Sequence, residues 1–275
     1  MTTAPKKERI MSQLPYELSF MHKFNLHKLV GLLMDDYDLR AIARIYGVRF
    51  GALRRIEEEF NRQIDESAKK LVQEAPPKPA PPAPYKILAF GDSITSDRTS
   101  YMKILNKYWG DGGRKIIDCA VSGDTTSNLI NRLYQTALNQ EFEWAVFFIG
   151  INDARQPDDG SKMCNISIDE YKKNMDYLVK TFLKHKKKLL LVTLPYVDND
   201  RLKKQFPDRN WVYDRGRVDR ANEFIRELAK KYKLALADLA KELRKASWDV
   251  LEPDGIHLNG AAHMVLCGML LGILP

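Results

Sequence analysis

The chain has 275 residues, 44% of them hydrophobic, and carries 44 Lys and Arg against 36 Asp and Glu, a formal net charge of +8. This length and apolar content suffice for a sizeable core, in one large domain or in a large and a small one. Three cysteines without C-x-x-C spacing argue against a disulfide framework, and the longest early apolar run, residues 29–34, is too short for a signal core or a membrane span. We therefore expect a cytoplasmic protein with no membrane span, and the mild positive charge permits anionic partners without requiring any.

Residues 1–73 are predicted to form a small all-α N-terminal domain. Apolar residues recur at helical spacing in three stretches between Leu26 and Ile64, without the alternation typical of strands. Within them, residues 38–56 resemble a helix-turn-helix, with the small Ala43 where two helices would cross, Gly47 at the turn and Leu53 pointing back.

This helix-turn-helix resemblance makes nucleic acid a possible partner. Arg49, Arg54 and Arg55 would reach phosphates or base edges. Three consecutive glutamates at 57–59 weigh against DNA binding, and protein docking or self-association of the module remains open.

Residues 74–84 are predicted to be a linker. The stretch EAPPKPAPPAP holds six prolines, which forbid a helix and favour an extended polyproline II spacer. The linker would separate the helical module from a larger domain, residues 85–275.

In residues 85–275, short apolar runs alternate with amphipathic stretches. This pattern predicts a three-layer, doubly wound α/β domain, in which helices cover both faces of a parallel sheet. The predicted strands are 86–90, 115–119, 144–150, 188–194 and 234–239, and the predicted helices are 127–138, 168–185, 218–232 and 261–271. In such a domain the ligand site lies beyond the carboxyl ends of the strands.

Four polar clusters stand where they would meet at that edge. They are GDS at 91–93, SGD at 122–124, GIND at 150–153 and DGIH at 254–257; the first three follow strands and the last precedes the final helix. Together they supply a hydroxyl, an imidazole, a carboxylate and N–H donors, the groups that acyl transfer requires.

The same four clusters resemble the blocks of the SGNH (GDSL-type) hydrolase family. The blocks read GDSIT, SGDTTS, GIND and DGIHLN in the family's order, with one conservative departure at Ile94, where Leu often stands. The resemblance covers about residues 85–275 and implies a flavodoxin-like five-stranded sheet and the hydrolysis of esters or thioesters.

The roles of five residues follow from this chemistry. Ser93 would attack the acyl carbon, His257 would act as general base and acid, and Asp254, three residues earlier, would orient the imidazole. The backbone N–H groups of Ser93 and Gly123 and the side-chain amide of Asn152 would form the oxyanion hole. Glycine suits position 123 because a Cβ there could obstruct the substrate oxygen.

Simpler interpretations stand beside these roles. Ser93 could serve only as a helix cap and Asn152 only as a turn-former, while His263, which has no acid three residues before it, is expected to be structural. Arg155 is a candidate substrate-binding residue because it lies close to Asn152 in the sequence. It would contact an anionic group on the substrate or form an ion pair with a loop acid, Asp158 or Asp159. No metal and no other cofactor is expected, because the histidines and cysteines do not fall into ligand spacing.

The prediction is therefore a cofactor-free esterase acting on a small-molecule ester. An acyltransferase or thioesterase on the same scaffold, and a DNA-binding regulator whose hydrolase-like domain senses a ligand, remain alternatives. The acyl length, the alcohol and the oligomeric state are left open, although the loop at 196–211 is a candidate lining of the substrate pocket.

Overall fold

The computed structural model describes residues 22–24, 38–77, 85–110 and 112–275. Most of the predicted linker, residues 78–84, lies outside the described residues. So does the first of the three predicted helical stretches, which holds Leu26, Leu29, Val30 and Leu33.

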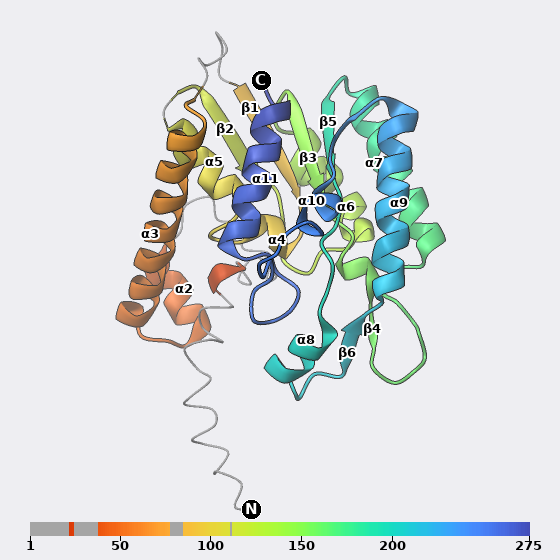
Figure 1. Cartoon of the computed structure of the whole chain (residues 1–275), viewed down its shortest axis with the longest axis horizontal. Coiled ribbons are helices and arrows are strands. Elements are labelled where there is room, and N and C mark those ends of the chain that lie inside the picture. The colour runs from red at the N-terminus through yellow and green to blue at the C-terminus, as the bar shows by residue number, and fades with distance from the viewer. Residues whose placement is uncertain (1–21, 25–37, 78–84, 111) are drawn as a thin grey trace, which may run out of the picture.

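The centre of the molecule is a five-stranded parallel sheet with the strand order β2-β1-β3-β5-β7 (Figure 1). Its strands are β1 (Tyr85–Gly91), β2 (Arg114–Asp118), β3 (Trp144–Phe148), β5 (Lys188–Val192) and β7 (Ala235–Ala237). The predicted parallel sheet and its five strands are confirmed. The chain forms β2 on one side of β1 and then crosses to β3 on the other, so the order reverses at β1, where a doubly wound sheet opens a crevice for ligands.

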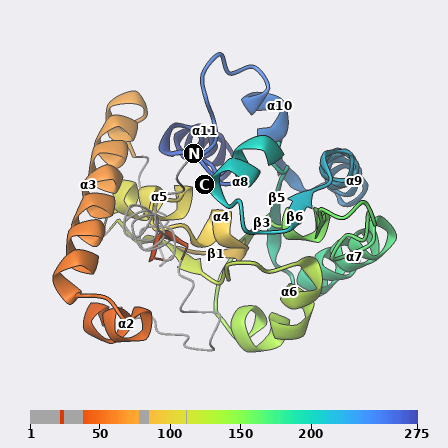
Figure 2. The same cartoon turned by 90° about the horizontal axis from the view of Figure 1, so that it is seen from below.

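Helices cover both faces of this sheet and complete the three layers (Figures 1 and 2). On one face lie α5 (Tyr101–Trp109) and α11 (Gly260–Ile273), and on the other lie α6 (Thr126–Arg132), α7 (Ile168–Lys184) and α9 (Arg215–Tyr232). A short helix, α10 (Leu239–Leu243), follows β7. The predicted helix 127–138 is divided: α6 ends at Arg132 and a π-helical segment continues over Leu133–Leu138.

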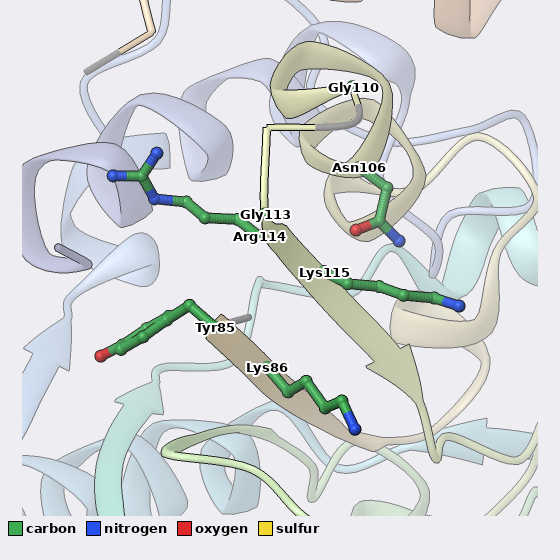
Figure 3. A pocket seen from close by; sticks show the side chains of 7 residues that line it. All are labelled: Tyr85, Lys86, Asn106, Gly110, Gly113, Arg114 and Lys115. Atoms are coloured by element: carbon green, nitrogen blue, oxygen red, sulfur yellow. The ribbon is translucent and has the colours of Figure 1, made fainter. Parts of the chain in front are cut away.

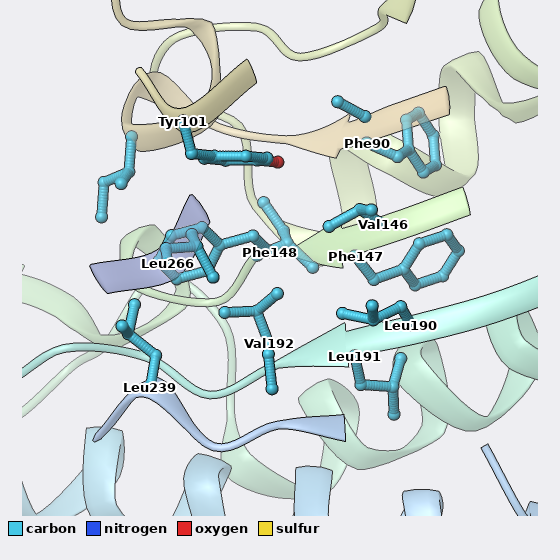
Figure 4. Close-up of a cluster of buried hydrophobic side chains, with 14 of the residues drawn as sticks. Phe90, Tyr101, Val146, Phe147, Phe148, Leu190, Leu191, Val192, Leu239 and Leu266 are labelled. Carbon is cyan, nitrogen blue, oxygen red and sulfur yellow. The ribbon is translucent and has the colours of Figure 1, made fainter. Parts of the chain in front are cut away.

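Side chains of consecutive residues in the central strands point to opposite faces of the sheet (Figure 4). In β3, Phe147 packs edge-on against Phe182 of α7 at 4.8 Å between ring centroids, while Phe148 lies 6.4 Å from Tyr101 of α5. All four side chains are at most 1% exposed. Both faces of each strand are therefore apolar, which is why these strands read as continuous hydrophobic runs.

The N-terminal part contains α2 (Leu39–Tyr46) and α3 (Phe50–Glu74). Gly47 ends α2 with φ +66°, a left-handed conformation that favours glycine, and Ile42, Ala43 and Leu53 are buried together beside the turn. Helix α3 runs for 25 residues and packs along α5 and α11, so that its residues Ala68 and Leu71 belong to the main core.

The arginines proposed to contact nucleic acid lie on the solvent side of this region. Arg49, Arg54 and Arg55 are exposed, and Arg54 pairs with Glu58 at 3.3 Å. Nucleic-acid binding stays a prediction. No described helix has both the length and the apolar character that crossing a membrane requires.

A second, two-stranded antiparallel sheet stands beyond the carboxyl ends of the main strands (Figure 1). It pairs β4 (Arg155–Pro157) with β6 (Trp211–Tyr213), and α8 (Asn199–Gln205) precedes β6. Figure 1 shows α8 and β6 below α4 (Ser93–Ser96), at this end of the molecule, and Figure 2 views the same end. The small sheet thus forms a wall beside the crevice.

Gly91, the last residue of β1, leaves no room for a side chain. A Cβ at this position would lie 2.5 Å from the backbone oxygen of Phe148 and 2.5 Å from Oγ1 of Thr95. We predict that Gly91→Ala lowers the free energy of unfolding by ~1–3 kcal/mol, the usual cost of overpacking, as measured by denaturant unfolding.

Gly268→Ala is the matched control. Gly268 is exposed on α11 and a Cβ there would meet nothing within 4 Å, so alanine should stabilise the helix by ~0.5–1 kcal/mol. Equal stabilities of Gly91→Ala and the unmodified protein would contradict the prediction.

Candidate active site

Ser93 is the first residue of α4, and one residue, Asp92, separates it from the end of β1. The cap of this helix is the preceding residue: the Asp92 carboxylate accepts the N–H of Ile94 at 3.0 Å. The Ser93 hydroxyl instead lies 2.8 Å from Nε2 of His257. The capping oxygen therefore belongs to Asp92, and the serine hydroxyl is directed to the imidazole.

His257 and Asp254 come from one tight loop that precedes α11. Nδ1 of His257 lies 2.7 Å from Oδ2 of Asp254, and Oδ1 of the same carboxylate accepts the backbone N–H groups of Ile256 and His257 at 2.9 and 3.0 Å. Gly255 allows the turn with φ +75°, and a Cβ there would clash with the carbonyl oxygen of Asp198. The three predicted side chains Ser93, His257 and Asp254 thus form one continuous hydrogen-bonded chain.

This chain of hydrogen bonds is almost closed to solvent, with Asp254 0%, His257 5% and Ser93 7% exposed. Burial opposes ionisation of Asp254, but the adjacent imidazole and the hydrogen bonds from His257 and two backbone amides outweigh it and lower its pKa to about 2. Asp254 is therefore a carboxylate at neutral pH, and it fixes the orientation of the imidazole through Nδ1.

The loops after β2 and β3 are joined to each other beside Ser93. The side-chain nitrogen of Asn152 donates to the backbone oxygen of Asp124 at 3.0 Å. One residue further, the buried carboxylate of Asp153 accepts the N–H and the hydroxyl of Thr126, at 3.1 and 2.5 Å. Asn152 thus does more than form its own turn, because its side chain ties its loop to the one that carries Gly123.

Gly123 has φ +84°, while a Cβ added to it would meet nothing within 4 Å. The left-handed backbone conformation by itself therefore favours glycine at position 123. The expected approach of a substrate oxygen is a second, separate reason.

A cavity of about 220 Å³ opens over these groups. Ser93, Gly123, Asn152 and His257 line it on the side of the main sheet. The opposite wall consists of aromatic and basic residues of the small sheet and the loop before it: Arg155, Phe206, Arg209, Trp211 and Tyr213.

Four of these wall residues were not among the predicted site residues: Phe206, Arg209, Trp211 and Tyr213. The first three lie within the loop at 196–211, which was predicted from the sequence as a candidate lining of the pocket. The Tyr213 hydroxyl lies 3.5 Å from Oδ1 of Asn152 and is buried with it. The sequence Trp-Val-Tyr at 211–213 could have predicted this wall, because alternate residues of a strand point to the same face, which puts both aromatic rings on one side.

Arg155 does not pair with either acid that the sequence offered. Asp158 pairs with Lys203 at 2.7 Å, and Asp159 accepts the N–H of Ser161. The guanidinium of Arg155 lies 5.6 Å from the centre of the Trp211 ring, and that of Arg209 lies at the same distance. Among the described residues neither arginine forms an ion pair with a carboxylate.

A larger hollow of about 490 Å³ lies at the amino ends of β1 and β2, at the opposite edge of the sheet from Ser93 (Figure 3). Lys86 and Lys115 point to one side of the two strands, and Tyr85 and Arg114 point to the other. The guanidinium of Arg114 also donates to the backbone oxygen of Pro275. These side chains do not converge on a common point.

His263, the competing histidine, is fully buried: its Nδ1 accepts the N–H of Tyr101 at 3.3 Å, and its Nε2 lies 3.5 Å from Asp97. It does not reach the cavity that contains Ser93. The described part of the chain holds no group of three or more acidic, histidine or cysteine side chains placed to bind a metal ion.

The buried carboxyl group of Asp92 leads to a prediction about how the stability of the fold depends on pH. Burial raises its pKa to about 7, and the carboxylates of Asp124 and Asp153 add to this effect, against the opposing N–H of Ile94 and the charge of His257. Between about pH 4 and pH 7, Asp92 is therefore protonated in the folded protein and ionised in the unfolded chain. Its contribution to the free energy of unfolding is fully present below about pH 4 and is lost as the pH rises to about 7.

Asp92→Asn keeps an oxygen that can cap α4 and removes the titration. The parent should lose stability between pH 4 and pH 8 as Asp92 ionises, and the variant should not. The difference in unfolding free energy, variant minus parent, should therefore increase by about 3 kcal/mol over this range, as measured by urea unfolding. The same substitution at an exposed acid, Asp200→Asn, is the control for the loss of one negative charge. An Asp92→Asn profile parallel to that of the parent would refute the prediction.

Comparison with known proteins identifies relatives of this fold and site. The profile of the GDSL-like lipase/acylhydrolase family matches residues 89–265. A relative, an acetylxylan esterase of Geobacillus stearothermophilus, is 27% identical over 202 residues, which cover 66% of this chain and 90% of that protein.

Two solved structures share the fold at lower identity. A catalytic mutant of an acetylxylan esterase from Geobacillus stearothermophilus superposes with a TM-score of 0.55 at 22% identity, covering 69% of this chain and 94% of the other. A lipase/acylhydrolase from Enterococcus faecalis gives 0.57 at 23% identity, covering 68% and 94%. Because the family match spans more than half of the chain and includes all four polar clusters, the chain belongs to the GDSL-like lipase/acylhydrolase family of carboxylic ester hydrolases.

Proposed function

We propose that this chain is a serine esterase that cleaves short-chain acyl esters through an acyl-enzyme on Ser93. The observation that supports this most directly is the hydrogen-bonded series Ser93–His257–Asp254, which ends at a cavity beyond the carboxyl ends of the strands. A buried hydroxyl within 2.8 Å of an imidazole, which in turn is held by an ionised carboxylate, is the arrangement that activates a serine for nucleophilic attack.

In the first half of the reaction, Oγ of Ser93 bonds to the acyl carbon and its proton passes to Nε2 of His257. The carbonyl oxygen becomes an oxyanion. The ester C–O bond then breaks, and the departing alcohol takes the proton back from Nε2. In the second half, water attacks the acyl-enzyme with the same imidazole as base, which releases the acid and restores the Ser93 hydroxyl.

The oxyanion would be bound by the backbone N–H groups of Ser93 and Gly123 and by the side-chain amide of Asn152. This assignment is supported by the common cavity that all three residues line. One hydrogen of the Asn152 amide is donated to Asp124, which leaves the second for the substrate oxygen. The contacts that join the loops after β2 and β3 hold these donors in place before the charge develops.

The size of the cavity supports a short acyl group. A volume of about 220 Å³ has room for an acetyl or similarly small group and for part of the alcohol, and the relative found above is named as an acetylxylan esterase. The polar and aromatic wall at 206–213 would then contact the alcohol part of the ester.

We further assign Arg155, together with Arg209, to binding an anionic group on that alcohol part. Both guanidinium groups border the cavity, both flank Trp211, and neither is neutralised by a carboxylate within the described residues. A carboxylate or phosphate on the substrate would supply the missing counter-charge.

The catalytic assignment predicts a graded loss of activity. With p-nitrophenyl acetate, Ser93→Ala and His257→Ala should each lower kcat by ~10³-fold or more, and Asn152→Ala by ~10²- to 10³-fold, with small changes in KM. His185→Ala, at an exposed histidine, is the control for His257→Ala. Unchanged turnover in Ser93→Ala or His257→Ala would reject the proposal.

The arginine assignment predicts selectivity for charge. In Arg155→Ala and in Arg209→Ala, KM for a carboxylated acetyl ester should rise by ~10-fold, while KM for its neutral methyl-ester analogue should stay within about twofold. Lys204→Ala removes a nearby exposed cation that does not line the cavity and should affect neither substrate. An equal change for both esters would exclude the anion site.

A further inference from the structure

A short segment far from the catalytic loops in the sequence, residues 22–24, lies against the imidazole of His257. The ring of Phe24 stacks on the His257 ring with the centroids 3.7 Å apart and the planes 23° from parallel. Phe24 is 1% exposed. Ser93 and Asp254 bind the two nitrogens at the edge of the imidazole, so Phe24 covers a face that those hydrogen bonds leave open.

The backbone of this segment is bound to the loop that follows α4. The carbonyl oxygen of Lys23 accepts the N–H of Arg98 at 2.6 Å, and that of Phe24 accepts the hydroxyl of Ser96 at 3.4 Å. Ser96 is the last residue of the helix that begins with Ser93. Phe24 is therefore anchored to the same short helix as the serine.

The side chain of Lys23 adds a second anchor. Its ammonium lies 2.9 Å from a carboxylate oxygen of Glu252, 3.2 Å from Asp97 and 3.0 Å from the Thr99 hydroxyl. Burial disfavours this charge, but Asp97 and Glu252 outweigh burial and raise the pKa of Lys23. Glu252 also donates its backbone N–H to the carbonyl oxygen of His257 at 2.8 Å, so one residue holds both Lys23 and the catalytic loop.

A third anchor joins the segment to the N-terminal helices. Nε2 of His22 lies 2.5 Å from Oε2 of Glu57 on α3, and Glu57 also pairs with Arg98. Burial, reinforced by the charge of Arg98, lowers the pKa of His22 to about 3, so this contact is a hydrogen bond of a neutral imidazole. In Figure 1 the segment is the short red ribbon between α3 and α4.

We infer that Phe24 is a positioning residue of the active site, which holds the plane of the His257 imidazole and stabilises the imidazolium formed during the reaction. When His257 takes the proton of Ser93, a cation appears against the face of an aromatic ring, where the interaction is attractive and water is excluded. An uncharged imidazole gains less from an aromatic ring than an imidazolium does, so the contact favours the state in which His257 holds the proton of Ser93. Phe24 does not line the substrate cavity, so its effect should appear in kcat and not in KM.

The test uses the full chain with Phe24→Leu, which keeps an apolar side chain of comparable volume but removes the ring. This variant should lower kcat for p-nitrophenyl acetate by about tenfold, with KM within about twofold of the parent. Phe142→Leu is the matched control: Phe142 is a buried phenylalanine packed on Phe182 near the amino end of β3, and its replacement should leave kcat unchanged.

A second readout separates this inference from the proposed function on which it rests. The rate at which a small neutral fluorophosphonate modifies Ser93 also depends on proton transfer to His257, and it requires no ester turnover. That rate should fall in Phe24→Leu by a factor similar to the fall in kcat. If the parent protein cleaved no ester, the proposed function would fail, and the ratio of phosphonylation rates would still decide the role of Phe24.

Three outcomes would overturn the inference. They are a kcat for Phe24→Leu within twofold of that for Phe142→Leu, a loss confined to KM, and a phosphonylation rate equal to that of the parent. If Phe24→Leu does not accumulate as folded protein, judged by its melting transition, Phe24→Met provides a flexible apolar side chain for the same measurements.

Discussion

A carboxylate that is completely enclosed by protein must be surrounded by hydrogen-bond donors, and the structure around Ser93 depends on how Asp254 meets this condition. Asp254 is 0% exposed, yet its pKa is lowered to about 2. Two backbone amides and the imidazole of His257 supply the donors, and all three come from the four-residue turn that also contains Asp254. The carboxylate of Asp254 thus stabilises the turn of residues 254–257, and the same hydrogen bonds fix the orientation of the His257 imidazole.

The other constraint is the direction of the strands. Because β1 and β3 are parallel neighbours, the residues that follow them leave the sheet at the same edge, and Gly91 is paired with Phe148 at that edge. The small sheet of β4 and β6 then closes the crevice from outside and brings the wall of arginine and aromatic side chains opposite the serine. Two sheets of different size therefore border one cavity: Ser93, Gly123 and Asn152 follow strands of the large sheet, and Arg155, Trp211 and Tyr213 belong to the small one.

The five strands and the long helices α7, α9 and α11 were predictable because buried parallel strands and amphipathic helices leave strong patterns over many residues. The pieces that were not predicted are short: α5, α8, β4 and β6 extend for three to nine residues, too few for a period to stand out. The division of the helix at Arg132 into α-helical and π-helical turns also has no signal in the sequence.

For the site, the residues in the four short motifs were predictable, since chemistry restricts which residue types can serve there. The contact of Phe24 with His257 was not, because it joins positions more than two hundred residues apart and depends on a segment outside any motif. Gly123 is an intermediate case: glycine was expected there, but its left-handed conformation is visible only in the structure.

The long helix α3 has a consequence for how the protein can be divided. It lies along α5 and α11, and its residues Ala68 and Leu71 are as buried as the core of the sheet domain. A fragment beginning at Tyr85 would carry the complete sheet and the side chains of Ser93, Asp254 and His257, but the sides of α5 and α11 that α3 covers would face water. An uncovered apolar surface of this kind favours self-association. We therefore expect the fragment to aggregate more readily than the full chain, in which α3 covers that surface.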